Sequence, residues 1–384
     1  MKKNFKNLIF IFLIIFSIHS HANSENDKLK IGVLVPLSGD NKKIGEQIIK
    51  ATKLALKDIN TKKIEIYPKD SGSNPTQTLT SASEFLNMGI NIVIGPVFYE
   101  SLSYLDEIDN ITFLSLTNKT INLPKNIISS GINATSQINA IKKFIEQIEL
   151  KKTIFLVPEI DYEGEIKKAI NQSKIKTSKI HIYNTEPTKL TQQIEKITNY
   201  KIRKQNLADE IRRVENSDLI DKEKQLEKLN KRYTIGNVRF DSVIISDFDE
   251  SLKSVITSLL YTDVSPKEKF FISFNQWFDQ SILRETNIQP IYYPSINKKN
   301  LDNFERKFKK EFNELPSFLS LLSYDLVGLI YYLSLKSDLS DVNKLFQRKN
   351  SFKGKIGIFE IENKKIYHKL NMYKVEQNKL IEIF

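Results

Sequence analysis

The sequence predicts an α/β protein built from two doubly wound parallel-sheet lobes. Apolar strands alternate with amphipathic helices along residues 28–148, and the same alternation restarts at Thr153. Alternation of this kind is typical of a parallel sheet covered by helices. Ligands of such proteins bind in the crevice beyond the carboxyl ends of the strands. The length of 384 residues suits two or so domains of about 150 residues each.

The first strand, turn and helix span residues 28–60. Lys28 to Pro36 is predicted as a buried strand, and a polar turn follows it at Ser38-Gly39. Apolar residues then recur every three or four positions from Ile44 to Ile59, as on one face of a helix. The remaining predicted strands of this half are 64–66, 91–95, 111–116 and 127–130.

The second half repeats the alternation and then becomes mainly helical from Leu301 to Leu345. Neither half shows the fixed period of a solenoid, which favours two separate lobes. The predicted strands are 153–157, 179–183, 241–245, 270–272, 357–360 and 372–375, and the predicted helices before residue 301 are 163–173 and 250–260.

One connection is far longer than a crossover requires. Residues 184–240 separate two predicted strands, whereas a crossover needs about a dozen residues. Apolar residues at helical spacing and abundant charge predict a helical hairpin insertion over 188–233, within the second lobe. The insertion is either an arm that docks a partner or a tolerated surface insertion, since long insertions cost little stability.

The N-terminus predicts a cleavable signal peptide over residues 1–22. Three lysines precede an apolar core from Leu8 to Ile18, and Ser20-His21-Ala22 supplies small residues for cleavage. The core is shorter than the roughly 20 residues that span a membrane. We therefore expect an exported, periplasmic protein without stable membrane insertion after the leader is removed.

Composition excludes several classes of function. The chain has no cysteine, which excludes disulfides, thiolate metal sites and a cysteine nucleophile. The net charge of +12 includes three leader lysines, and the other lysines are interspersed with acids, so we expect no nucleic-acid partner.

No catalytic motif is present. G-x-S-x-G, a Walker loop and H-E-x-x-H are all missing, and outside the leader only His181 and His368 remain. We therefore expect no enzyme activity, no catalytic residue, no cofactor and no metal. The acids Asp247 to Glu250 are either an acid/base pair or the charged first turn of a helix, and their position favours the helix.

The candidate ligand site consists of loops that follow strands. Several of these loops precede a helix N-terminus, where free N–H groups suit an anionic group. Hydroxyl groups would receive such a group, aromatic rings would cover it, and an acid would meet any ammonium. The candidate residues are Ser38, Phe98, Ser115, Thr117, Tyr162, Asp249 and Trp277.

The chain resembles the leucine-binding family of type I periplasmic binding proteins. The resemblance rests on IGVLVPLSG, on NIVIGP, on Asp161-Tyr162-Glu163-Gly164 and on Ser323-Tyr324-Asp325. The pieces YPKDSGSNP, IVIGPVF, FDSVIISD and FNQWFDQSIL are similar to the branch of penicillin-binding-protein activators.

The resemblance implies two lobes joined by a multi-crossing hinge and a ligand clamped between them. The implied first lobe is 28–135 with 277–335, and the second is 136–276 with 336–384. The family holds an amino-acid carboxylate with hydroxyl residues in two loops. In this chain the first of these loops, Pro96-Val97-Phe98, has no hydroxyl residue, whereas the second, Ser115 to Asn118, keeps its hydroxyl residues. The missing hydroxyl argues against an amino acid such as leucine as the ligand.

The implied function is capture of a small polar solute, amino-acid-like or anionic, with an ABC permease as partner. The alternative is an activator-like interaction protein that regulates peptidoglycan synthesis through a cell-wall synthase. The better-known activators are lipoproteins with an extra helical domain, and this chain lacks the cysteine that would carry a lipid.

Overall fold

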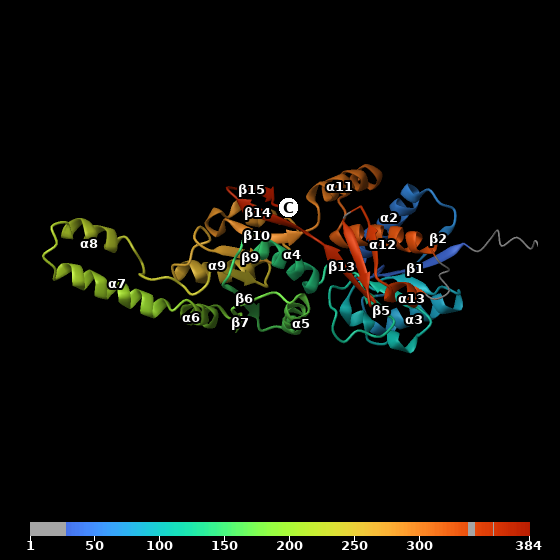
Figure 1. The fold of residues 1–384 in the computed structure, drawn as a ribbon. Coiled ribbons are helices and arrows are strands. Elements are labelled where there is room, and N and C mark those ends of the chain that lie inside the picture. The colour runs from blue at the N-terminus through green and yellow to red at the C-terminus, as the bar shows by residue number, and fades with distance from the viewer. Residues whose placement is uncertain (1–27, 337–341, 356) are drawn as a thin grey trace, which may run out of the picture.

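The computed structural model describes residues 28–336, 342–355 and 357–384. Two α/β lobes lie side by side, and a helical arm extends from the second lobe (Figure 1). The predicted leader, residues 1–22, lies outside the described residues. In the described part, no helix combines the length and the apolar character that crossing a membrane requires.

The first lobe has a parallel sheet with the strand order β2-β1-β3-β4-β5. Buried apolar residues of its strands pack against helices on both faces. Its strands are β1 (Leu29–Val35), β2 (Ile64–Asp70), β3 (Ile92–Ile94), β4 (Thr112–Ser115) and β5 (Ile127–Ser129). Its helices are α2 (Lys42–Ile59), α3 (Pro75–Asn87), η1 (Tyr99–Leu102), η2 (Leu105–Glu107), α11 (Lys298–Phe312), α12 (Phe318–Ser334) and α13 (Val342–Gln347).

Two glycines permit close backbone approaches in this lobe. A Cβ on Gly45, in the first turns of α2, would lie 1.8 Å from the carbonyl oxygen of Pro36. Gly95 has a φ of +107°, and a Cβ there would lie 2.1 Å from the carbonyl oxygen of Leu34. Both glycines therefore hold the loops beyond β1 and β3 against their neighbours.

The second lobe has the strand order β15-β14-β10-β9-β8-β6-β7. All its neighbouring strands are parallel except β14, which is antiparallel to both β10 and β15. Its strands are β6 (Thr153–Pro158), β7 (Lys179–Tyr183), β8 (Ser242–Ile245), β9 (Phe270–Ser273), β10 (Ile291–Ser295), β14 (Asn371–Glu376) and β15 (Lys379–Glu382). Its helices outside the arm are α4 (Ala134–Gln147), α5 (Glu163–Ser173), α9 (Asp249–Tyr261), α10 (Gln280–Arg284) and η3 (Thr286–Ile288).

The strand pairing differs from the implied lobe boundaries at two places. Strand β10 was expected in the first lobe, but it pairs with β9 and β14 of the second. Residues 350–369 were expected in the second lobe, but they form a separate antiparallel sheet of β11 (Asn350–Lys353), β12 (Ile358–Glu362) and β13 (Lys365–Lys369). The ring of Phe352 packs on Tyr332 of α12, with centroids 5.6 Å apart, so this sheet belongs beside the first lobe.

The chain passes between the lobes after β5, after β10 and after β13. Side chains tie the first and third of these crossings together. Asn133 caps α4 by accepting from the Ser136 amide at 2.9 Å, and its Nδ2 donates to the carbonyl of Ile366 at 2.9 Å. His368 is buried and lies 2.8 Å from the carbonyl oxygen of Ser130. The multi-crossing hinge therefore has a packed polar centre.

The long connection between β7 and β8 contains α6 (Pro187–Ile197), α7 (Tyr200–Glu215) and α8 (Lys222–Asn230). Helices α7 and α8 form an arm that points away from the first lobe (Figure 1). Arg203, only 7% exposed, anchors the base of the arm. Its guanidinium donates to the carbonyls of Gly236 and Thr262 and to the Thr234 hydroxyl, at 3.0, 2.9 and 2.7 Å.

Candidate functional site

The loops beyond β4 and β9 both reach the boundary between the lobes. Two direct contacts join them across this boundary. The loop beyond β4 contacts the first turn of α5, and the loop beyond β9 contacts the first residue of α12. The crevice expected from the sheet topology is therefore bridged by the protein's own side chains.

Glu165 of α5 makes the first of these contacts and is 5% exposed. One carboxylate oxygen accepts from the amides of Thr120 and Ile121, both at 2.6 Å, and the other accepts from the Thr120 hydroxyl at 2.7 Å. Lys168, one turn further along, donates to the Thr120 carbonyl at 2.7 Å. The sequence did not single out Glu165, because an acid in the first turn of a helix is usually solvated.

Trp277 makes the second contact. Its ring stacks on Phe318 with centroids 4.4 Å apart and an interplanar angle of 24°. Such pairs contribute about 0.5–1.5 kcal/mol beyond the area they bury. Trp277 thus faces an aromatic ring of the other lobe at the inter-lobe boundary.

The candidate residues of the first lobe mainly contact other residues of that lobe. Ser38 is exposed and hydrogen-bonds to Asp70. Burial would raise the pKa of Asp70, but hydrogen bonds from Ser38 and from the Leu37 and Gly72 amides lower it. Phe98 is half-buried and packs against the core.

Ser115 and Thr117 are both buried. The Ser115 hydroxyl donates to the carbonyl of Pro96 at 2.9 Å, so its one proton is already engaged. The Thr117 hydroxyl accepts from the Lys119 amide at 3.2 Å and keeps its own proton for another acceptor. Of these two hydroxyls, Thr117 is therefore the better donor to a ligand.

The acids near Asp249 separate into two environments. Asp249 and Glu250 are exposed in the first turn of α9, and Glu250 pairs with Lys253 at 2.9 Å. Asp247 is instead buried, and it accepts from the Tyr183 hydroxyl at 2.5 Å. Burial raises the pKa of Asp247, while the hydrogen bonds from Tyr183 and the Phe248 amide oppose that rise. Asp249 and Glu250 thus occupy the charged first turn that their position suggested.

Three buried polar atoms of the second lobe have no hydrogen-bond partner among the described residues. They are the Tyr162 hydroxyl, Asn275 Nδ2 and Gln276 Oε1, at the ends of β6 and β9. Gln276 Nε2 donates to the carbonyls of Asp247 and Phe274 at 3.1 and 3.0 Å, which fixes the amide and leaves its oxygen unpaired.

The amide of Asn275 is fixed in a similar way. Its Oδ1 accepts from the Trp277 amide and from the Ser295 hydroxyl, both at 2.9 Å. An unpaired buried polar atom costs about 1–3 kcal/mol, and a bound ligand or water is one explanation for such an atom. The sequence pointed to this loop, but through Trp277 rather than through the two amides beside it.

Two parallel-sheet lobes, three chain crossings and polar strand ends at the boundary define the fold of type I periplasmic binding proteins. The family model described as periplasmic binding protein matches residues 28–199. This part of the chain is similar to that family. A comparison with curated proteins gives no match.

Solved structures share the fold over nearly the whole chain. The C-domain of LpoA (YraM) from Haemophilus influenzae, a regulator of PBP1A, has a TM-score of 0.63 at 15% identity, covering 92% of this chain and 100% of that one. Full-length LpoA gives 0.62 at 15% identity and 93% coverage, and this chain spans 59% of its length. The leucine-binding protein LivK from Thermotoga maritima gives 0.55 at 13% identity, covering 93% and 98%. At these identities the likeness shows a shared fold.

Proposed function

We propose that the protein is a non-enzymatic periplasmic binding protein that captures a small polar solute between its lobes. The observation that carries the proposal is the set of three unpaired buried atoms at Tyr162, Asn275 and Gln276. Together they offer a hydroxyl, an amide donor and an amide acceptor, which suits an amino-acid-like or anionic molecule. We include Thr117, from the loop beyond β4, and Trp277, from the loop beyond β9, in the same proposed site.

A thermal-shift screen of the purified protein tests the proposal. The compounds are amino acids, small carboxylates and muropeptide fragments. A ligand present at a hundred times its dissociation constant adds about 2.7 kcal/mol of stability. A shift with one chemical class would identify the solute, and the absence of any shift would contradict solute capture.

The variant Tyr162→Phe gives a sharper prediction. Removing an unpaired buried hydroxyl should stabilise the free protein by about 1 kcal/mol, whereas the solute should bind about tenfold more weakly. Calorimetric titration and thermal unfolding measure the two effects separately. Tyr104→Phe is the matched control, because Tyr104 is 47% exposed and lies in the first lobe. Unchanged affinity in Tyr162→Phe would remove this residue from the site.

A second candidate function is that of an interaction protein whose arm contacts a cell-wall synthase. Two observations favour it. The lobes are already bridged by Glu165 and Trp277, and the arm exposes apolar side chains, with Ile220 fully exposed and Tyr233 75% exposed. The likeness to LpoA, described as a regulator of PBP1A, suggests the kind of partner.

Pull-down with a synthase tests this second candidate. Ile220→Lys should abolish the interaction, because it places a charge where an apolar side chain would be buried. Leu315→Lys, at a leucine of the first lobe that is 61% exposed, is the control. Binding that survives Ile220→Lys would contradict docking through the arm tip.

A further inference from the structure

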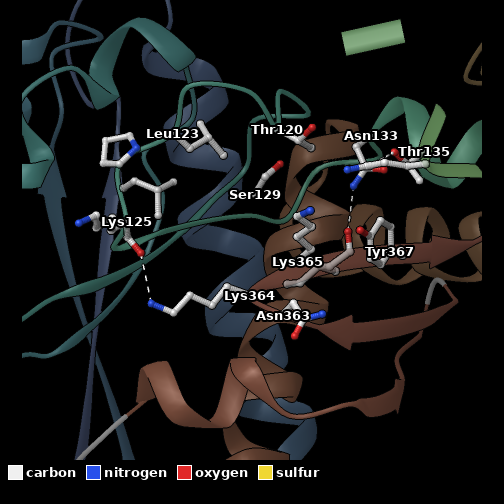
Figure 2. A pocket seen from close by; sticks show the side chains of 14 residues that line it. Thr120, Leu123, Lys125, Ser129, Asn133, Thr135, Asn363, Lys364, Lys365 and Tyr367 are labelled. Atoms are coloured by element: carbon white, nitrogen blue, oxygen red, sulfur yellow. Dashed lines mark hydrogen bonds between the residues drawn. The ribbon is translucent and has the colours of Figure 1, made fainter. Parts of the chain in front are cut away.

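A cavity of about 180 Å³ lies beside the hinge and is separate from the strand-end site. Both lobes contribute to its walls (Figure 2). The loop between β4 and β5 forms one side, Thr135 of α4 and Gln172 of α5 form another, and the turn between β12 and β13 closes it. A single water molecule needs about 10–15 Å³, so the cavity has room for a small organic or inorganic ion.

The charge of the cavity is one-sided. Among the described residues that line it there are three lysines, Lys125, Lys364 and Lys365, and no aspartate or glutamate. The Lys364 ammonium points to the carbonyl of Lys125, at 3.5 Å (Figure 2). The half-buried Lys365 points into the space between Ser129 and Asn133, and in the described part of the chain its ammonium has no hydrogen bond or ion pair.

Asp106 and Asp109 line an adjoining hollow together with Lys125 and Lys364, so the uncompensated charge of the cavity is mainly that of Lys365. Burial lowers the pKa of Lys168, the Glu165 carboxylate raises it, and the Lys365 ammonium lowers it again. Both oxygens of Glu165 already accept hydrogen bonds from residues 120 and 121. Gln172 Oε1 accepts from the Thr135 hydroxyl at 3.1 Å, so the Gln172 amide group keeps its N–H donors. A partly buried cation without a counter-charge is unfavourable, and an anion would relieve that cost.

We propose that this cavity binds a small multivalent oxyanion, with the Lys365 ammonium as its main charged contact. Phosphate-like and polycarboxylate ions share the chemistry that the lysines recognise. Because both lobes line the cavity, the bound ion would hold the lobes in their present arrangement. The proposal goes beyond solute capture, since it uses none of the strand-end residues.

Thermal unfolding and calorimetric titration with inorganic phosphate and with citrate test the proposal. Sodium chloride at matched ionic strength controls for general screening. We expect phosphate, citrate or both to bind and to raise the unfolding temperature above that in chloride, and the comparison identifies the preferred class. Equal effects of all three salts would overturn the proposal.

Variants locate the binding. Lys365→Gln should weaken binding of the preferred ion by about ten- to a hundredfold, as expected for a lost charged hydrogen bond. Lys310→Gln removes the same charge from an exposed position on α11 and should bind like the unmodified protein. Lys365→Arg should retain binding, and it serves as a folded variant if Lys365→Gln is unstable. Wild-type affinity in a folded Lys365→Gln variant, or lost affinity in Lys310→Gln, would contradict the assignment.

Discussion

His368 lies at the point where two of the three chain crossings touch. Its ring is buried, and Nε2 donates to the carbonyl of Ser130 when the imidazole is neutral. Its main-chain amide donates to the Ser136 hydroxyl at 2.9 Å. The histidine therefore contributes to the hinge as an uncharged, hydrogen-bonded group rather than as a catalytic or metal-binding one.

Burial lowers the pKa of His368 from 6.5 to about 4, although hydrogen bonds near Ser130 and Gly131 act in the opposite direction. Above pH 6.5 the ring is neutral in both the folded and the unfolded chain, and its contribution to stability is complete. As the pH falls below 6.5 the unfolded chain binds a proton first, so the free energy of unfolding should drop by about 3 kcal/mol between pH 6.5 and pH 4. Chemical denaturation at a series of pH values measures this slope.

His368→Gln keeps a donor for the Ser130 carbonyl and does not titrate in this range. In this variant the dependence on pH between 6.5 and 4 should become clearly shallower. A slope as steep as that of the unmodified protein would mean that other groups cause the acid sensitivity.

Helix α5 and the loop beyond β4 form one of the direct contacts that hold the lobes together. Hydrogen bonds to a charged group contribute about 1.5–3 kcal/mol, and Glu165 accepts three of them. We predict that Glu165→Ala weakens this link and that the Thr120 and Ile121 amides exchange with solvent at least about tenfold faster. Hydrogen exchange measures the rates, and small-angle X-ray scattering would detect separation of the lobes.

Glu163→Ala is the matched control in the same turn of α5. Glu163 pairs with Lys167 four residues later, a surface pair that is worth at most about 1 kcal/mol. Amide exchange at residues 120 and 121 should not change in this variant. Equal exchange rates in both variants would show that the link does not depend on Glu165.

The sequence predicted the helices and strands much better than it predicted which strands pair with one another. Strand and helix periods predicted both sheets, because apolar side chains must repeat with the geometry of the element that buries them. They did not predict that β10 joins the second sheet or that residues 350–369 form a sheet beside the first lobe. Such pairings join segments far apart in sequence, and the residue pattern of one strand does not indicate which strand pairs with it.

The same limit applies to the candidate site. Loops that follow parallel strands were identifiable because the ends of those strands share one edge of a sheet. Whether a hydroxyl in such a loop faces a ligand depends on the path of the backbone, as Ser115 shows by donating to Pro96. Likewise, nothing local distinguishes the buried Glu165 from the half-buried Glu163 two residues earlier.

At the scale of the whole molecule, three parts are arranged in a row. The arm lies at one end and the first lobe at the other, with the second lobe between them (Figure 1). A partner at the tip of the arm would therefore leave the strand-end site and the hinge cavity accessible. The proposed solute capture and the proposed partner docking would use different surfaces and would be compatible in one molecule.

Shortening the arm tests whether it is an independent part. In the described structure α8 has no buried residue, and the buried Val214 of α7 is outside the hydrophobic core clusters of the lobes. Arg203 at the base of α7 is instead fixed by the main chain of residues 236 and 262. We predict that replacing residues 208–231 with a short Gly-Ser linker changes the free energy of unfolding by no more than about 1 kcal/mol. Thermal shifts with phosphate or a solute should be retained, while binding of a synthase should be lost.

Arg203→Met provides the contrast, because it keeps the arm and removes its anchor. The carbonyls of Gly236 and Thr262 would lose their buried donor, at a cost of about 3 kcal/mol or more. Denaturant unfolding of the shortened protein and of Arg203→Met measures both changes. If the shortened protein is the less stable of the two, the arm is part of the second lobe's core and cannot be treated as a separate docking element.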